Sequence, residues 1–190
     1  MLGCSLDMMY LICQAVDAVL DRDDPDHHSE THLQTIRSLE LRLQRLGQQQ
    51  SATLDVDPHA MALNTDIAEL YRLATLVYLC RVARADPRDS KTVSECLTQA
   101  FAILAGMTSC DRPWPFFVLA LEASTDEHRK TVLAVLEGSL GKRKQGNMAL
   151  TGRMIRDAWV QQDLRTTYVD PLELYDHVIS RNRAPPAFFT

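Results

Sequence analysis

Residues 112–115 read Arg-Pro-Trp-Pro, and an unbroken apolar run, residues 116–121, follows them directly. Each proline lacks a backbone N–H and disfavours helix in the residue before it, so this segment cannot lie inside a helix, although Pro115 suits a first turn. The apolar run is too short to span a bilayer. A helix that is apolar on every side belongs in the middle of a helical domain. We therefore expect residues 114–121 to form a buried central helix around which the other helices pack.

The composition favours an all-α fold. The 190 residues suffice for one domain or slightly more. Seven glycines and eight prolines are few, strand-like alternation is scarce, and Ala, Leu, Arg, Gln and Glu are abundant. We therefore expect an irregular multi-helix bundle of about seven to eight helices around the buried central helix.

Apolar residues spaced three and four apart give the approximate helix positions. We expect helices at residues 5–20, 30–46, 57–85, 91–105, 114–121, 126–140, 147–163 and 171–179. Side chains suited to helix N-caps stand at the start of several of these segments: Ser5, Ser90, Thr125, Asn147 and Asp170. Two of the helices should end at a glycine, namely Gly47 and Gly141.

Two of the expected helices carry apolar stripes, and the second stripe is narrow. In the first helix, the stripe expected to face the core consists of Leu6, Met9, Cys13, Val16 and Leu20. In the helix at 30–46 the stripe has nearly heptad spacing and consists of Leu33, Ile36, Leu39, Leu43 and Leu46. Such a narrow seam fits packing against one or two helices of the same chain, or against a partner chain.

The five cysteines are widely spaced and include no CxxC pair, so they do not form a disulfide framework. Cys13, Cys80 and Cys96 stand among apolar residues. We expect them to be small core side chains in a reducing compartment. No apolar run is long enough for a membrane span, and the N-terminus lacks the basic region of a signal peptide, so we expect no membrane association.

The net charge of −5 argues against nucleic-acid binding by this chain alone. One compact basic cluster, Lys142-Arg143-Lys144, follows the expected helix end at Gly141. It fits a solvated loop, and the alternative is part of a nuclear-import or phosphate-contacting segment.

Two clusters contain residue types that can carry chemistry. His27, His28 and His32 lie close together, but a metal site needs a third or fourth ligand with fixed geometry, so a solvated loop end is the preferred interpretation. Residues 21–24, Asp-Arg-Asp-Asp, match the DxDD motif of protonating terpene cyclases, whose carboxylates need a rigid apolar cavity. Here they stand beside Pro25, which indicates an acidic loop. The sequence contains no common hydrolase, metalloprotease or nucleotide-binding motif, so we expect no catalytic site, cofactor or metal.

Glu122 is the polar residue of most interest, because it closes the apolar helix at a point where its carboxylate is partly shielded from water. A shielded carboxylate needs a partner. We hypothesise that Glu122 pairs with Arg129, seven residues further on, or with Arg72 in the helix at 57–85. The alternative is that Glu122 faces water at a helix end.

Three blocks of the sequence together resemble the fungal-specific transcription factor domain, the helical regulatory region of fungal zinc-cluster transcription factors. The first, residues 2–7, is similar to a short glycine-containing helix entry of that family. The second, residues 69–79, contains a Tyr-Arg-x-Ala pattern, and the third begins with Trp-Pro at 114. Ala120 stands where the family often has glycine. The residues that carry the resemblance are Tyr71, Arg72, Trp114, Pro115, Glu122, Arg129 and Trp159.

The resemblance implies a non-enzymatic regulatory domain at residues 1–183, followed by a tail at 184–190. Such a domain modulates a nuclear transcription factor through intramolecular contacts, partner proteins, dimerisation or small ligands. The six-cysteine zinc cluster of the family is absent from the sequence, so zinc is expected only in a missing DNA-binding domain. The resemblance thus predicts a fragment or a shortened gene product that acts in the nucleus without binding DNA itself.

Alternatives outside transcription stay open. One is a helical protein-interaction scaffold that docks through the seam at residues 33–46, which an exposed seam would favour. Another is a sensor of a small apolar ligand, with a pocket lined by the faces at residues 70–79 and 116–121. An enzyme is the third, and it would need a polar cleft with converging titratable groups.

Overall fold

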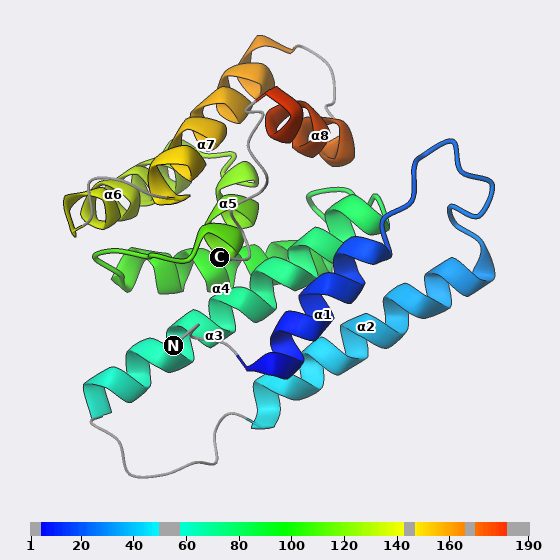
Figure 1. Ribbon diagram of the computed structural model, residues 1–190, viewed down its shortest axis with the longest axis horizontal. Coiled ribbons are helices and arrows are strands. Elements are labelled where there is room, and N and C mark those ends of the chain that lie inside the picture. Colours follow the sequence, from blue (N-terminus) through cyan, green and yellow to red (C-terminus); the bar gives the residue numbers. More distant parts are fainter. Residues whose placement is uncertain (1–4, 50–57, 143–146, 166–169, 182–190) are drawn as a thin grey trace. The chain divides into compact units, whose positions relative to one another are not determined.

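The computed structural model describes residues 5–49, 58–142, 147–165 and 170–181. Within these ranges every regular element is helical, which confirms the all-α fold class. In chain order the elements are α1 (Leu6–Asp17), α2 (Glu30–Gln49), α3 (Pro58–Tyr78), the π-helical turn η2 (Leu79–Ala83), α4 (Lys91–Gly106), α5 (Pro113–Leu121), α6 (Asp126–Lys142), α7 (Asn147–Leu164) and α8 (Pro171–Arg181) (Figure 1).

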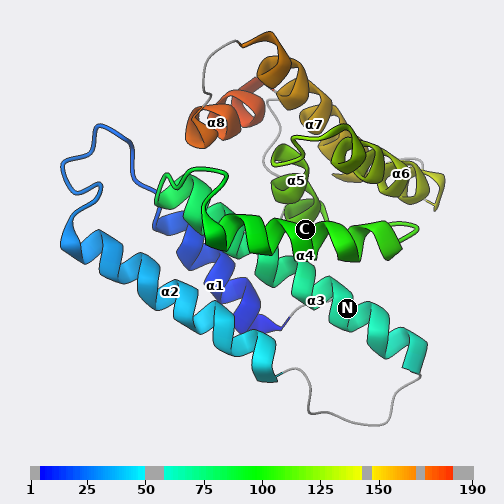
Figure 2. The same ribbon diagram turned by 180° about the vertical axis from the view of Figure 1, so that it is seen from behind.

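Two compact units divide the chain, Met1–Cys96 and Leu97–Thr190, and the boundary between them falls inside α4. In the first unit α1, α2 and α3 pack on one another, and α1 and α2 run side by side in opposite directions (Figure 1, Figure 2). In the second unit α5 packs on α6 and α7, and α7 also packs on α6 and α8. Each unit therefore contains mutually packed helices of its own.

α5 is the helix that the proline-flanked apolar stretch predicted. It begins at Pro113, so both prolines occupy its first turn, where a backbone N–H would have no helical acceptor in any case. Every residue from Trp114 to Leu121 is buried. The expectation of a short helix buried on all sides is confirmed.

The core-facing side of α1 differs from the predicted stripe. Its buried residues are Met8, Leu11, Ile12 and Ala15. Leu6 is 84% exposed and Val16 is 37% exposed, and Cys13 is exposed as well. The expectation that Cys13 is a core side chain is therefore wrong, whereas Cys80 and Cys96 are buried. α1 carries two apolar stripes, and only the one not chosen from the sequence is buried.

The leucine seam of α2 lies inside the first unit. Ile36, Leu39 and Leu43 are buried, and α2 packs on both α1 and α3. Packing within the chain therefore accounts for the seam, and the exposed docking face that a scaffold would need is not found there.

Side-chain caps fix three helix starts where the sequence predicted them. The hydroxyls of Ser5 and Thr125 each accept a hydrogen bond of 3.2 Å from the backbone N–H three residues later, at the starts of α1 and α6. The Asp170 carboxylate accepts one of 2.7 Å from the backbone N–H two residues later, at the start of α8. These bonds satisfy N–H groups that have no acceptor within the helix.

Other predicted helix ends are wrong in detail. The Ser90 hydroxyl makes no hydrogen bond with the described residues, and Asn147 is the first residue of α7 instead of the residue before it. α2 and α6 continue past Gly47 and Gly141, to Gln49 and Lys142. A glycine in the last turn lowers helix stability only modestly, so it does not by itself stop a helix.

Candidate functional site

Three of the residues that carry the family resemblance, Glu122, Arg129 and Trp159, lie together at the C-terminal end of α5. The last carbonyls of a helix lack partners within the helix. Here Trp159 donates its indole N–H to the carbonyl of Ala120 at 2.8 Å, and Gln162 donates to the carbonyl of Leu121 at 2.9 Å. Side chains of α7 thus take over hydrogen bonds that α5 cannot make for itself.

Arg129, in the first turns of α6, completes this arrangement. Its Nε donates to the carbonyl of Ala123 at 3.3 Å, and its guanidinium forks to the Asp163 carboxylate with two bonds of 2.8 Å. The guanidinium carbon also lies 5.1 Å from the centre of the Trp159 ring, within cation–π range. We call Arg129, Trp159, Gln162 and Asp163 the α5 clamp, because together they hold the end of α5 against α6 and α7.

The charges of the α5 clamp lie near the surface. Hydrogen bonds from Arg129 hold the pKa of the Asp163 carboxyl below its usual value, and the same bonds raise the pKa of Arg129. The Asp163 side chain is largely exposed to water. The ion pair itself therefore adds little stability, and the buried indole carries the larger contribution.

Glu122 is the C-cap of α5 and is only 4% exposed. Its position agrees with the shielded carboxylate that the sequence indicated. The two arginines proposed as its partners make ion pairs elsewhere: Arg129 with Asp163, and Arg72 with Glu69, where Arg72 Nε lies 2.8 Å from Oε2. An arginine can serve more than one acceptor, so the pairing of Glu122 stays a prediction.

The remaining resemblance residues are core residues or lie beside the core. Trp114 and Pro115 are buried in the first turn of α5. Tyr71 is buried in α3 of the first unit, where its carbonyl accepts the Thr75 hydroxyl at 2.7 Å, and Arg72 pairs with Glu69 one turn before it. These positions build helices instead of presenting reactive groups.

Sequence reasoning missed two members of the α5 clamp, Gln162 and Asp163. They follow Trp159 by three and four residues, so they lie on the same face of α7. That spacing was the available signal, and it could have suggested Asp163 as a partner for Arg129.

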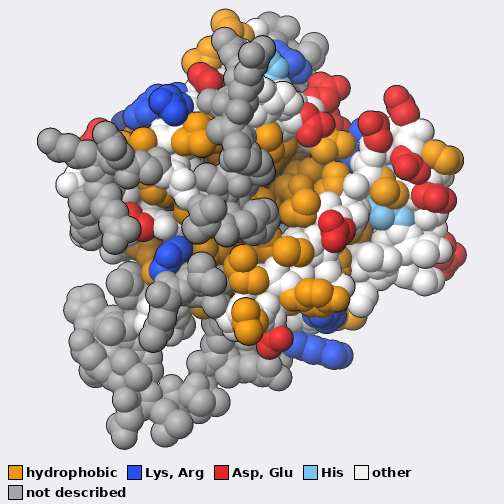
Figure 3. Space-filling view, in the orientation of Figure 1, with side chains coloured by type: hydrophobic (Ala, Val, Ile, Leu, Met, Phe, Trp, Pro, Cys, Tyr) orange, Lys and Arg blue, Asp and Glu red, His pale blue; other side chains and the backbone are white. Residues whose placement is uncertain are grey.

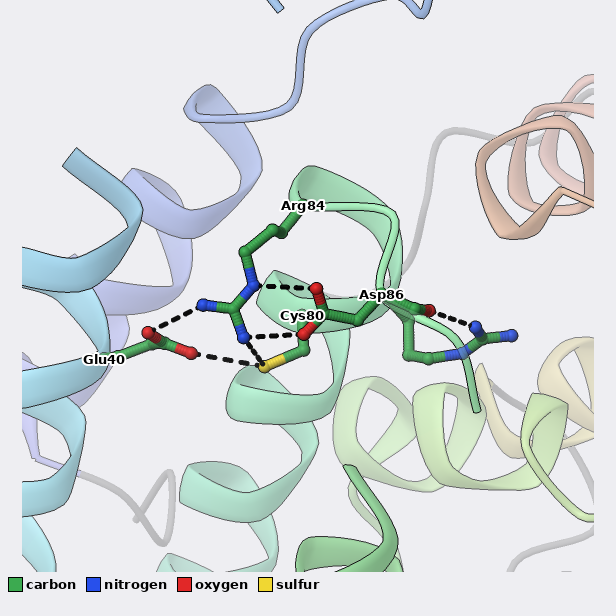
Figure 4. A network of polar contacts seen from close by, with 5 residues as sticks. Glu40, Cys80, Arg84 and Asp86 are labelled. Carbon is green, nitrogen blue, oxygen red and sulfur yellow. Dashed lines mark hydrogen bonds and ion pairs between the residues drawn. The ribbon is translucent and has the colours of Figure 1, made fainter. Parts of the chain in front are cut away.

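A second polar cluster surrounds Cys80, where α3 ends in the π-helical turn η2 (Figure 4). A bond of 3.0 Å from the Arg84 N–H to the Leu79 carbonyl closes this turn, and Ala85 then adopts a φ of 60°. A non-glycine residue adopts such a left-handed value only where the surrounding structure holds it. The single helix expected to continue to residue 85 therefore changes form at Leu79.

The side chains of the Cys80 cluster join α2 to this turn. Arg84 forks to Asp86 with bonds of 2.8 and 2.6 Å and donates to Glu40 of α2 at 2.9 Å. The Cys80 thiol lies 3.3 Å from the other carboxylate oxygen of Glu40 and 3.4 Å from Arg84 (Figure 4). Arg81 also donates to the backbone carbonyl of Asp86. One guanidinium thus binds two carboxylates and a thiol.

Burial disfavours the reactive thiolate form of the cysteine in this cluster. Burial raises the pKa of the Cys80 thiol far above its usual value, and the nearby Arg84 offsets this only in part. Burial also raises the pKa of Cys96 and of Cys110 to about 11. Burial thus favours the neutral form of all three thiols, which is the less reactive form.

Removing the charge of Arg84 should weaken the contact between α2 and η2. We expect Arg84→Met to lower the free energy of unfolding by about 2 kcal/mol, because the substitution leaves the half-buried carboxylates of Glu40 and Asp86 without their shared cation. Urea unfolding followed by circular dichroism measures the loss. As a control, Lys91→Met removes a cation whose partner Glu95 lies in water, and it should change stability by less than about 0.5 kcal/mol. Equal losses for both variants would show that the Cys80 cluster contributes nothing beyond a surface ion pair.

The histidines at the α1–α2 loop are hydrogen-bonded. His32 is buried; its Nδ1 accepts the backbone N–H of His28 at 3.2 Å, and its Nε2 lies 2.9 Å from the carbonyl of Ala18. Both ring nitrogens of His32 are thus occupied, and the described residues contain no group of three or more His, Cys, Asp or Glu side chains that could hold a metal. The imidazole ties the two ends of the loop together.

The acidic residues of the same loop form turns. The carboxylates of Asp21 and Asp24 each accept a backbone N–H two residues further on, at 3.2 and 2.8 Å. Such bonds are typical of Asx-turns. Figure 3 shows acidic side chains gathered on the surface around this loop, which agrees with an exposed loop instead of a terpene-cyclase cavity.

Of the basic cluster, only Lys142, the last residue of α6, belongs to a described helix, and the other two residues lie outside the described ranges. No helix in the described ranges is both long and apolar enough to cross a bilayer.

Comparison with known proteins finds relatives of this chain. The family model described as "Fungal specific transcription factor domain" matches residues 1–183. Among curated proteins, the transcription factor iacI of Pestalotiopsis fici is 30% identical over 126 residues, which cover 64% of this chain and 32% of that protein. The match therefore spans about a third of the length of this relative. No solved structure matches the chain.

Proposed function

The chain belongs to the family of fungal specific transcription factor domains, and from this premise we propose that it is a non-enzymatic regulatory module of a zinc-cluster transcription factor. The module changes the activity of the factor through contacts with other segments of the same protein, with partner proteins or with a small ligand. Zinc and DNA contacts belong to a separate DNA-binding domain. The site of action is the nucleus, and this chain itself carries no cofactor.

The observation that carries this proposal is the match to the family model over residues 1–183, together with the roles of the resemblance residues. Trp114 and Pro115 start the buried helix α5, and Arg129 and Trp159 hold its end. These residues contribute to a packed helical body, which suits a module that acts through its surface. The net charge of −5 makes protein segments better partners for that surface than DNA.

Of the two alternative functions, the scaffold is disfavoured and the ligand sensor stays a prediction. A scaffold that docks through the α2 seam is disfavoured, because Ile36, Leu39 and Leu43 are buried within the first unit. The sensor hypothesis stays a prediction, because the two faces proposed to line its pocket belong to different units.

A reporter assay tests the regulatory role. We expect that inserting this chain between a heterologous DNA-binding domain and a constitutive activation domain changes reporter output in yeast several-fold at equal protein level. Trp159→Ala, which weakens the α5 clamp, should remove most of that change. Val160→Ala, a neighbouring substitution at a residue that is 53% exposed, should keep it. The same output with and without the inserted chain would contradict the proposal.

A further inference from the structure

α1 exposes an apolar stripe that nothing in the fold above explains. Leu6, Tyr10, Cys13 and Val16 follow one another at intervals of four, three and three residues, so they share one side of the helix. Tyr10 is 60% exposed, and the other three are exposed as well. Figure 3 shows hydrophobic side chains gathered on the face that α1 presents in Figure 1. Exposed apolar side chains grouped on one side of a helix, instead of scattered singly, are typical of an interaction surface.

The two ends of this stripe carry opposite charge. The loop that follows α1 contains Asp21, Asp23, Asp24 and Asp26. Because α2 runs back along α1, its C-terminal half lies beside the first half of α1, and there it exposes Arg42 and Arg45. The Arg42 guanidinium lies 5.9 Å from the centre of the Tyr10 ring and donates to the Gln14 side chain at 2.6 Å. Arg42 and Arg45 therefore border the stripe at one end, where Asp7 is exposed as well, and Asp17 and the four loop aspartates border it at the other, so that the two ends differ in net charge.

We propose that this stripe is the surface through which two copies of the chain associate, with their α1 helices antiparallel across a two-fold axis. A two-fold interface must be self-complementary. In the antiparallel arrangement each acidic loop lies beside Arg42 and Arg45 of the other copy. A parallel arrangement would place one acidic loop against the other. The charge pattern therefore selects both the occupant, a second copy, and its direction.

The size of the surface limits the affinity. The twelve residues of α1 extend about 18 Å. A standard interface buries about 800 Å² on each partner, and the stripe with its charged borders is smaller than that. We expect a weak dimer with a dissociation constant of about 1–100 μM. Attraction between exposed charges is screened by salt, so the dimer should weaken as ionic strength rises.

Sedimentation velocity of the whole chain, over about 1 to 200 μM, tests the surface. We expect a concentration-dependent dimer in the unchanged chain. The double substitution Leu6→Glu with Tyr10→Glu should leave a monomer. Its thermal unfolding should stay close to that of the parent, because Leu6 is 84% exposed and Tyr10, although Arg42 lies over its ring, is 60% exposed. Val160→Glu places the same charge on an exposed apolar residue of α7 and should leave the dimer intact. A chain that is monomeric throughout, or a dimer that survives the double substitution, would overturn the proposal.

Charge reversal tests the antiparallel direction. Arg42→Glu with Arg45→Glu should raise the dissociation constant at least about ten-fold. Adding Asp23→Arg and Asp26→Arg to the same chain should restore most of the affinity, because each reversed loop would again face an opposite charge in the second copy. If the four substitutions together weaken the dimer further, the antiparallel arrangement is wrong.

Cys13 offers an independent readout within the stripe, because it is the exposed cysteine among those that the structure describes. In a Cys4→Ser background, a short bismaleimide should link two chains through Cys13, and Cys13→Ser should abolish the link. Failure to cross-link at concentrations where sedimentation shows a dimer would place the contact elsewhere. These measurements do not depend on reporter output, so self-association and the regulatory role can fail separately.

Discussion

Trp159→Ala is expected to lower the free energy of unfolding by about 3–5 kcal/mol. The Trp159 side chain is only 7% exposed, and its removal leaves a large cavity beside α5. The substitution also removes the 2.8 Å hydrogen bond to the Ala120 carbonyl, which then stays buried without that donor. Arg129 loses the ring over which its guanidinium lies. All three losses act at the same end of α5, and the expected value covers them together.

Trp159→Phe separates the hydrogen bond from the packing. It keeps much of the buried ring but removes the indole N–H, and we expect a loss of about 1–2 kcal/mol. Val160→Ala, on the exposed side of α7, should change stability by less than about 0.5 kcal/mol. Urea unfolding followed by circular dichroism gives all three values. A loss below about 1 kcal/mol for Trp159→Ala would mean that the α5 clamp does not hold the helix.

The helix positions were predictable because their causes are local in the sequence. Two prolines before an apolar run place the start of α5 within one residue of its observed start. Ser5, Thr125 and Asp170 are caps whose bonds join residues two or three apart, so the sequence contains both partners. Such signals need no knowledge of the tertiary structure.

The buried face of α1 was not predictable in the same way. The helix has two apolar stripes with helical spacing, and the sequence gives no local reason to prefer Met8, Leu11, Ile12 and Ala15 over the other stripe. Contacts with α2 and α3 decide which stripe is buried. Because periodicity reports only that a stripe exists, an exposed stripe can be mistaken for a core face.

The polar clusters likewise contain some residues that the sequence indicated and others that it did not. Arg129 and Trp159 were chosen because they match a family pattern. Asp163 and Gln162 were missed because their partners lie about 30 to 40 residues away, and the local signal that they do have, their spacing from Trp159, does not name those partners. The Cys80 cluster depends on the π-helical turn at Leu79–Ala83, which brings Arg84 and Asp86 toward Glu40. Sequence spacing assumes regular helix, so it could not place these side chains together.

Gly138→Ala is the second substitution for which we expect a large effect. A Cβ atom at Gly138 would stand 1.8 Å from the backbone oxygen of Thr108, a contact that a side-chain rotation cannot relieve. The loop cannot easily retreat, because the buried Ser139 hydroxyl accepts the Cys110 N–H at 2.8 Å and lies 3.0 Å from the Cys110 carbonyl. Separating α6 from this loop would break those contacts. We therefore expect the free energy of unfolding to fall by about 3 kcal/mol, at the upper end of the usual range for overpacking.

The same helix provides a matched control for this prediction. Gly141 also lies in α6, but a Cβ atom there would meet nothing within 4 Å. Gly141→Ala should therefore raise the free energy of unfolding by less than about 0.5 kcal/mol, because alanine has the higher helix propensity but Gly141 lies in the last turn of α6. The two substitutions are chemically identical and should shift the urea midpoint in opposite directions. If Gly138→Ala also stabilised the chain, α6 would not pack closely against residues 108–110. The hydrogen bonds of Ser139 would then not hold the segment that leads into α5.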